Sequence, residues 1–230
     1  MTCAHTLSRV TPAIGSTLVA LLVACAGGPP PPDWQANARS ALDRAAAAYL
    51  VGDARVEADE FERARSNIAR TGRADLLARA ELMRCAVRVA SLEFEPCARF
   101  EPLRSDAAMP ERAYADHLAA RRLSGDDIAR LPAGQQAAAA AVATGTEASP
   151  ASVQAIDDPL SRLIAVAVLF QAGQASPAVI ALAADTASAQ GWRRPLLAWL
   201  NVQALRAERG GDAVEAQRLR RRIGLVHDAK

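Results

Sequence analysis

The sequence predicts an all-α protein built from stacked antiparallel helical hairpins, on the basis of its composition and the spacing of its helix-breaking and helix-capping residues. Of the 230 residues, 51% are hydrophobic but only 4% are aromatic. Alanine, leucine, arginine and glutamate favour helices, whereas strands favour the β-branched and aromatic residues that are scarce here. Glycine, proline and Ser or Asp residues divide the chain at short intervals, as expected where glycine ends a helix and Asp or Ser begins the next.

The expected helices follow one another with short connections. Gly52-Asp53 ends the first and caps the second, and Thr71-Gly72, Ser124-Gly125 and Gly210-Gly211-Asp212 act in the same way. The expected spans are 33–51, 54–71, 73–92, 97–104, 108–122, 125–143, 150–173, 176–190, 192–209 and 212–226.

The helix expected over 73–92 has apolar residues on two nearly opposite faces. One stripe comprises Leu76, Ala80, Met83 and Val87, and the other Leu82, Cys85, Val89 and Leu92. A helix at the edge of a bundle needs only one apolar stripe. Two stripes predict packing on both sides of this helix, as in stacked hairpins.

Residues 163–184 contain no charged side chain. A transmembrane hairpin is one interpretation, but only Leu163–Phe170 is continuously apolar, far short of the roughly 20 residues that a spanning helix needs. Two buried helices joined by a turn fit better, with Pro177 in the first turn of the second helix.

The N-terminus has the pattern of an export signal. Arg9 is the only charged residue before an uncharged segment, Ala13–Ala24, that is too short to span a bilayer. This segment ends in Leu22-Val23-Ala24-Cys25. The four residues resemble the lipobox of bacterial lipoproteins. The alternative is an ordinary cleaved signal peptide followed by an unrelated cysteine.

The lipoprotein resemblance implies an anchor and a location. Residues 1–24 are then a signal peptide, and Cys25 becomes the acylated first residue. Alanine rather than aspartate at position 26 implies the outer membrane, with the protein on its periplasmic face. Residues 25–32 form a tether, in which four prolines favour an extended polyproline II conformation. Residues 33–230 are expected to form a helical periplasmic domain.

Three parts of the chain resemble tetratricopeptide repeats, in which small residues let paired helices approach. The first is Ala48-Tyr49, Gly52-Asp53 and Phe61 to Ala64; the second is Gly211–Ala216 after 192–209; the third is 160–190. Glu57 stands where the repeat has alanine, Arg220 stands where it has an aromatic residue, and 93–150 shows no repeat. The sequence leaves open whether the domain is tetratricopeptide-like or an irregular helical bundle.

Cys85 and Cys97 are expected to form a disulfide. An exported chain enters an oxidising compartment, and a turn at 93–96 separates the helix of Cys85 from the segment that begins at Cys97. Two buried free thiols are the alternative. The spacing of these cysteines and the distance to any histidine argue against a metal site.

Residues that carry chemistry are few. Two histidines follow the signal peptide, His117 and His227, and no nucleophile elbow, zinc-binding His pair or phosphate-binding glycine loop is present. The near-neutral charge gives no support for nucleic-acid binding. Asp126-Asp127 and Asp157-Asp158 lie near expected helix starts, where the helix dipole favours negative charge. Glu93, Glu95 and Glu101 cluster around Cys97, but no base or metal ligand pairs with them. The arginines at 218, 220, 221 and 222 are expected to form a solvated face that suits the C-terminal end of the last helix, and contact with anionic lipid or an acidic partner is the alternative.

The sequence therefore predicts a non-enzymatic outer-membrane lipoprotein that serves as an adaptor or assembly factor for an envelope complex. It predicts an envelope protein partner and the membrane anchor on Cys25, with no cofactor, metal, nucleic acid or small-molecule substrate. A helical cell-wall-acting enzyme or regulator, and a structural lipoprotein without a dedicated partner, are the alternatives.

Overall fold

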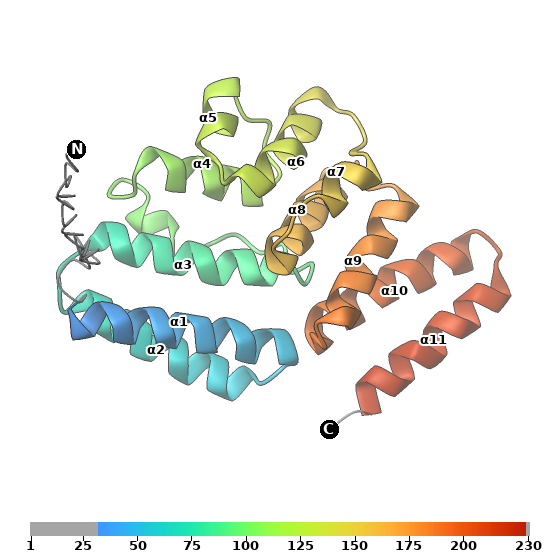
Figure 1. Cartoon of the computed structure of the whole chain (residues 1–230), viewed down its shortest axis with the longest axis horizontal. Coiled ribbons are helices and arrows are strands. Elements are labelled where there is room, and N and C mark those ends of the chain that lie inside the picture. Colours follow the sequence, from blue (N-terminus) through green and yellow to red (C-terminus); the bar gives the residue numbers. More distant parts are fainter. Residues whose placement is uncertain (1–31, 229–230) are drawn as a thin grey trace, which may run out of the picture. The chain divides into compact units, whose positions relative to one another are not determined.

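A computed structural model describes residues 32–228, and this part of the chain contains helices and no strand (Figure 1). Most neighbouring helices pack in antiparallel pairs, so the predicted all-α class and its hairpin arrangement are confirmed. The helices are α1 (Asp33–Val51), α2 (Ala54–Ala69), α3 (Ala74–Val89), α4 (Met109–Leu118), α5 (Gly125–Arg130), α6 (Ala133–Thr144), α7 (Pro150–Gln154), α8 (Pro159–Gln171), α9 (Pro177–Ala189), α10 (Arg193–Arg209) and α11 (Ala213–Asp228). The predicted signal peptide, Cys25 and the tether up to residue 31 lie outside the described residues.

The first hairpin, α1 and α2, turns at Gly52-Asp53 as predicted. Gly52 has a φ of 93°, a conformation that costs glycine little, and its backbone N–H bonds to two carbonyls at the end of α1. The Asp53 side chain accepts a hydrogen bond from the N–H of Val56 and caps α2. Small residues line this seam, where Ala41 and Ala64 are completely buried.

Helix α3 is buried on two sides, as its two apolar stripes predict. Ala80 packs with α1 and α2 residues, and Val87 packs with Tyr49 and Leu50 of α1. Leu82 and Val89 belong to the main core, which extends through α8 and α9 to α10. In Figure 1, α3 lies between the blue α1–α2 hairpin and the green α4.

The uncharged segment 163–184 forms two core helices joined by a turn. Every residue from Leu163 to Leu169 is buried in α8. Ser176 caps α9 and Pro177 lies in its first turn, as predicted. None of the helices in the described part of the chain is both long enough and apolar enough to cross a bilayer.

Three predicted helices were wrong in extent. The helix expected over 125–143 is two helices, because Pro132 has no backbone N–H to donate and ends α5 at Arg130. The helix expected over 150–173 is also two, because the Asp158 side chain caps α8 and interrupts the segment. The helix expected over 97–104 is a single 3₁₀ turn, Glu101–Leu103.

A cluster around Tyr49 joins the first hairpin to the C-terminal half of the domain. The Tyr49 ring lies between two guanidinium groups, with Arg194 of α10 4.2 Å and Arg88 of α3 5.6 Å from its centroid. Glu93 pairs with both arginines, at 3.3 and 3.5 Å. Trp192 packs against the apolar cluster that Tyr49 forms with Leu50 and Val87. These contacts fix α1, α3 and α10 relative to one another.

Candidate partner-binding groove

A wide groove lies between α3, α4, α8 and the α5–α6 connection. Its volume is about 540 Å³, within the range of about 300–1,000 Å³ that ligand sites usually have. It is lined by Arg79, Leu82, Met83, Ala86, Val87, Pro110, Glu111, Tyr114, Arg130, Leu131, Pro132, Asp158, Leu160, Ser161 and Ile164.

The floor of the groove is apolar. Helix α3 contributes Met83 and Val87 at i, i+4 spacing, which places both side chains on one face of the helix. Leu160 and Ile164 of α8 have the same spacing and line the groove from the other side. An apolar floor of this kind favours an apolar occupant, because binding removes hydrocarbon surface from water.

The polar groups of the groove come from α3, α4, the end of α5 and the start of α8. Arg79 of α3 forms an ion pair with Glu111 of α4, through one carboxylate oxygen, Oε1. The Arg79 side chain is 70% exposed, whereas that of Glu111 is only 12% exposed. Its second oxygen, Oε2, is buried and has no hydrogen-bond partner among the described residues. Such a group is open to a donor from an occupant, because a buried acceptor without a partner is costly.

Tyr114 and Asp158 add a donor and an acceptor to the groove lining. Burial, and to a lesser degree the nearby Asp158 carboxylate, raise the pKa of the Tyr114 hydroxyl above its ordinary value. The hydroxyl is therefore protonated at neutral pH and can donate a hydrogen bond. Asp158 uses Oδ2 to cap α8, at 2.6 Å from the N–H of Ser161.

A buried His117–Gln135 pair supports the groove from behind. The Nε2 atom of His117 lies 3.0 Å from Oε1 of Gln135, and Gln135 in turn donates to the Ser161 carbonyl at 2.9 Å. The pair thus joins α4, α6 and α8. Burial lowers the pKa of His117, against the opposing effect of the Gln135 hydrogen bond, so the imidazole is neutral at pH 7. His117 is a packing residue in this position.

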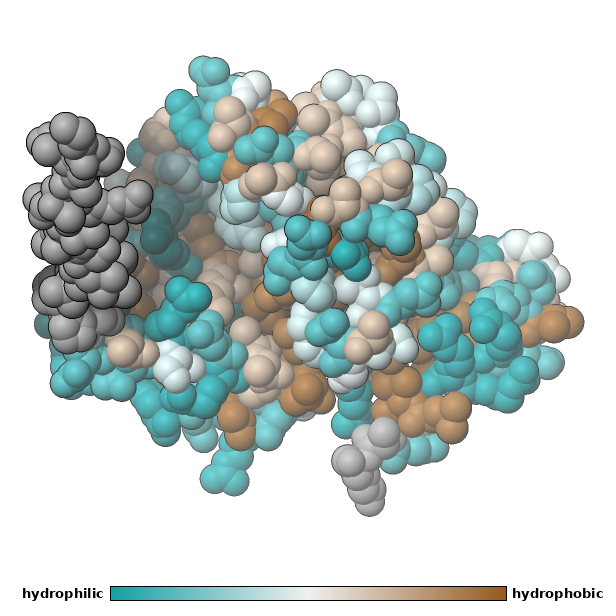
Figure 2. Space-filling view, in the orientation of Figure 1, coloured by the Kyte–Doolittle hydropathy of each residue, from teal (hydrophilic) through white to brown (hydrophobic). Residues whose placement is uncertain are grey.

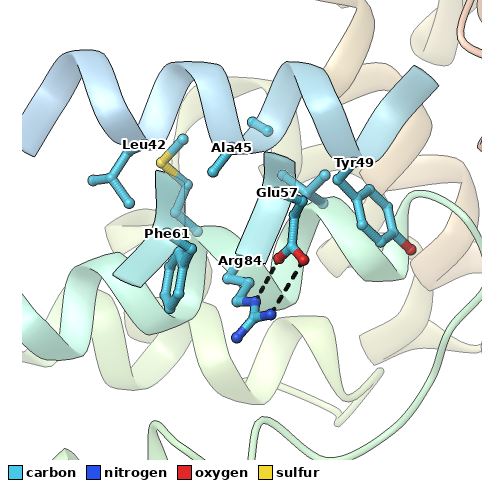
Figure 3. Close-up of a pocket in the computed structure, with 9 residues that line it drawn as sticks. Leu42, Ala45, Tyr49, Glu57, Phe61 and Arg84 are labelled. Carbon is cyan, nitrogen blue, oxygen red and sulfur yellow. Dashed lines mark hydrogen bonds and ion pairs between the residues drawn. The ribbon is translucent and has the colours of Figure 1, made fainter. Parts of the chain in front are cut away.

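A second, much smaller cavity lies between α1, α2 and α3 (Figure 3). Its volume of about 10 Å³ is at the limit for one water molecule. Glu57 lies there and bonds to Arg84 of α3 through two hydrogen bonds of 2.7 and 3.3 Å. The Arg84 guanidinium also lies 4.5 Å from the centroid of the Phe61 ring. We interpret this cavity as part of the packing between hairpins, because it is too small for a ligand.

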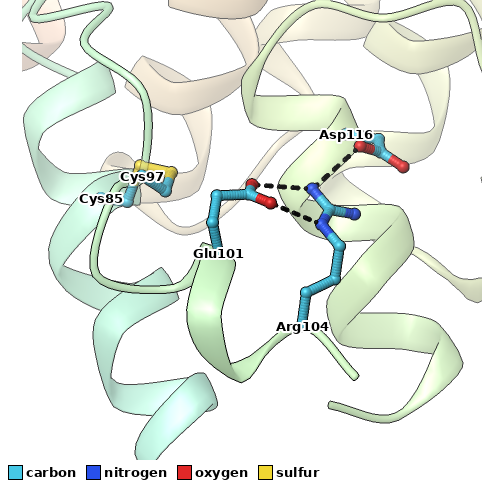
Figure 4. The surroundings of a disulfide bond; sticks show 5 residues. All are labelled: Cys85, Cys97, Glu101, Arg104 and Asp116. Atoms are coloured by element: carbon cyan, nitrogen blue, oxygen red, sulfur yellow. Dashed lines mark hydrogen bonds and ion pairs between the residues drawn. A yellow bond between two sulfur atoms is a disulfide. The ribbon is translucent and has the colours of Figure 1, made fainter. Parts of the chain in front are cut away.

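Cys85 and Cys97 form a disulfide, as predicted, with their Cα atoms 5.7 Å apart. The bond ties α3 to the segment that leads into the 3₁₀ turn (Figure 4). Beyond it, Arg104 bonds to Glu101 at 2.9 and 3.0 Å and to Asp116 of α4 at 3.2 Å. The disulfide indicates an oxidising, extracytoplasmic environment.

The other predicted candidates do not meet in one site. Asp127 and Asp158 are engaged at the starts of α5 and α8, in agreement with their predicted role. Glu93 pairs with arginines on two helices, and Glu101 pairs with Arg104. His227 is exposed near the end of α11. Within residues 32–228, no three His, Cys, Asp or Glu side chains are placed to hold a metal ion together.

No family model, curated protein or solved structure matches this chain. Its function must therefore be inferred from its own residues. The groove is the feature that sequence reasoning missed. Its lining comes from segments between residues 79 and 164 that carry no motif, and only the two-sided patterning of α3 signalled that an apolar face was present there.

Proposed function

We propose that this chain is a lipid-anchored envelope protein that acts as an adaptor and holds a segment of a partner protein in the groove between α3, α4 and α8. The open, mostly apolar groove carries the proposal. Its floor suits apolar side chains, while the Tyr114 hydroxyl and the free oxygen of Glu111 suit donors and acceptors of a polypeptide backbone or a polar side chain.

The location in this proposal rests on the N-terminal sequence and is supported by the disulfide. Leu22-Val23-Ala24-Cys25 resembles a lipobox, and Ala26 favours the outer membrane in that family. The Cys85–Cys97 bond is compatible with export. Extended as its four prolines favour, a tether of eight residues would reach about 25 Å, which would keep the helical domain close to the membrane surface.

The first hairpin, α1 and α2, is the part of the domain that supports a tetratricopeptide-like repeat. Phe61 and Ala64 of α2 are buried against α1, as the corresponding residues of a tetratricopeptide repeat are expected to be. Glu57 departs from the repeat, and its carboxylate is satisfied by Arg84 of the next helix. We propose a tetratricopeptide-like beginning followed by irregular helices.

Crosslinking from the groove tests the adaptor function. A photoreactive amino acid replaces Arg79, which is exposed at the groove, and in a matched control it replaces Arg39, which is exposed on α1. The full chain is expressed in its own cells and irradiated, and crosslinked partners are identified by mass spectrometry. We expect a defined envelope protein from position 79 and not from 39. The additional substitution Leu160→Glu should remove that crosslink, because it places a charge on the apolar floor. Equal products from both positions would contradict the adaptor function.

The anchor has a separate test. A palmitate analogue should label the wild type and not Cys25→Ser. Equal labelling of the two proteins would refute the anchor without bearing on the groove.

A further inference from the structure

Helix α11 ends the described helical stack and packs mainly against one neighbour, α10. Its inward face is held by Ala216 and Leu219, which are its only buried residues. In stacked helical proteins the terminal element usually presents a polar outer face, because nothing packs on it. The outer face of α11 departs from this pattern, because it carries two exposed large apolar residues as well as charged ones.

The outer face is a regular stripe of four residues. Val214, Arg218, Arg221 and Leu225 follow one another at i, i+4, i+7 and i+11, which places all four on one side of the helix. Val214 is 80% and Leu225 76% exposed, more than any other large apolar residue in the described part of the chain. Figure 2 shows hydrophobic surface near both ends of α11 with hydrophilic surface between them. The stripe is about 16 Å long, the length of three helical turns.

The charge around this stripe is positive. Residues 193–228 carry eight arginines and four acidic residues, a net charge of +4, whereas residues 33–192 carry 17 arginines and 21 acidic residues, a net charge of −4. Arg218 binds both carboxylate oxygens of Glu215 on its own helix, through two hydrogen bonds of 2.6 Å each, whereas Arg221 has no ion pair within the described residues. The last hairpin is thus a cationic end on a domain whose remainder is acidic.

We propose that the outer face of α11 is a docking surface for an acidic amphipathic helix of a partner protein. Such a helix would place apolar side chains on Val214 and Leu225 and carboxylates between them, opposite Arg218 and Arg221. Arg221 suits this role because it is unpaired within the described residues and a planar guanidinium can bind a carboxylate through two hydrogen bonds. A second copy of α11 does not fit, because its own arginines would face these. The surface is distinct from the groove, so this inference does not depend on the proposed function of the groove.

A peptide pair and a charge reversal test this surface. The probe is a synthetic helical peptide of about 18 residues, enough to cover three turns, with leucines at both ends and two glutamates in the middle. A matched peptide has lysines in place of the glutamates. Binding of each to the full acylated chain in detergent is measured by fluorescence anisotropy. We expect the glutamate peptide to bind and the lysine peptide to bind at least about tenfold more weakly.

The variant Arg218→Glu/Arg221→Glu should reverse this preference, because both side chains point to solvent and the substitution changes charge without disturbing the core. Arg39→Glu on α1 is the matched control and should bind as the wild type does. Val214→Ser/Leu225→Ser should weaken binding of the glutamate peptide without making the lysine peptide the preferred one. Unchanged circular dichroism and urea midpoints establish that each variant is folded.

Equal binding of the two peptides, or no effect of the charge reversal, would overturn the proposal. So would a membrane role for this face. In that case neither peptide would bind, and Cys25→Ser protein would sediment with phosphatidylglycerol vesicles but not with phosphatidylcholine vesicles, in a manner that the charge reversal abolishes.

Discussion

Reduction of the Cys85–Cys97 disulfide should destabilise the helical domain by about 3 kcal/mol. The bond closes a loop between residues 12 positions apart, and the chain-entropy relation for a loop of that length gives about 3 kcal/mol at 25 °C. Phe100 is completely buried only a few residues beyond Cys97, so a released loop also weakens the hold on a core side chain. The wild type in its oxidised and reduced forms is the appropriate pair, because both forms retain the same two sulfur atoms.

Urea unfolding followed by circular dichroism measures this difference. With a slope of about 2 kcal/mol per M, reduction should lower the midpoint by about 1.5 M. In a thermal scan, the same change lowers the melting temperature by about 6–12 °C for a domain of this size. The double variant Cys85→Ala/Cys97→Ala is the control, and a reducing agent should leave its midpoint unchanged.

A decrease of less than about 1 kcal/mol on reduction would refute the reasoning, because it falls well below the chain-entropy value. It would mean that residues 85–97 are already constrained in the unfolded chain. A decrease of the same size in the Cys85→Ala/Cys97→Ala variant would show that the reducing agent acts elsewhere.

Three further predictions concern buried or strained groups. Burial lowers the folded-state pKa of His117, so the unfolded chain binds the extra proton first as the pH falls. The free energy of unfolding should therefore decrease below about pH 6.5, by at most about 1.4 kcal/mol per pH unit. Urea midpoints measured from pH 7.5 to 5 should show this slope, which His117→Gln should reduce and replacement of the exposed His227 by Gln should not. Ala120 has a φ of 51°, so Ala120→Gly should raise the free energy of unfolding by about 1 kcal/mol, and a decrease would contradict the strain argument. Glu57→Ala should cost about 2 kcal/mol, less than for a fully buried pair because the Arg84 side chain is 21% exposed. Adding Arg84→Leu should recover most of that loss, and a double-mutant cycle without coupling would argue against the ion pair.

The groove shows where sequence reasoning stopped. Its apolar floor was partly visible, because two stripes on α3 predicted packing on both sides. The opposite wall of the groove could not be predicted from the sequence, because Leu160 lies far along the chain from α3 and its position depends on where α8 begins. The Asp-Asp-Pro segment before α8 and the proline at 132 interrupt stretches whose composition otherwise favours one continuous helix. Local breaks of this kind decide which side chains meet.

By itself, the sequence determined the helical class, the Gly52-Asp53 turn, the cysteine pair and the buried helices at 163–184. Each of these depends on residues close together in the chain, where propensity, caps and periodicity act. Only the tertiary structure decided that Glu57 pairs with Arg84, that His117 bonds to Gln135, and that α3, α4 and α8 enclose a groove. These contacts join helices whose separation and angle result from the packing of the whole core, and no local pattern records that packing.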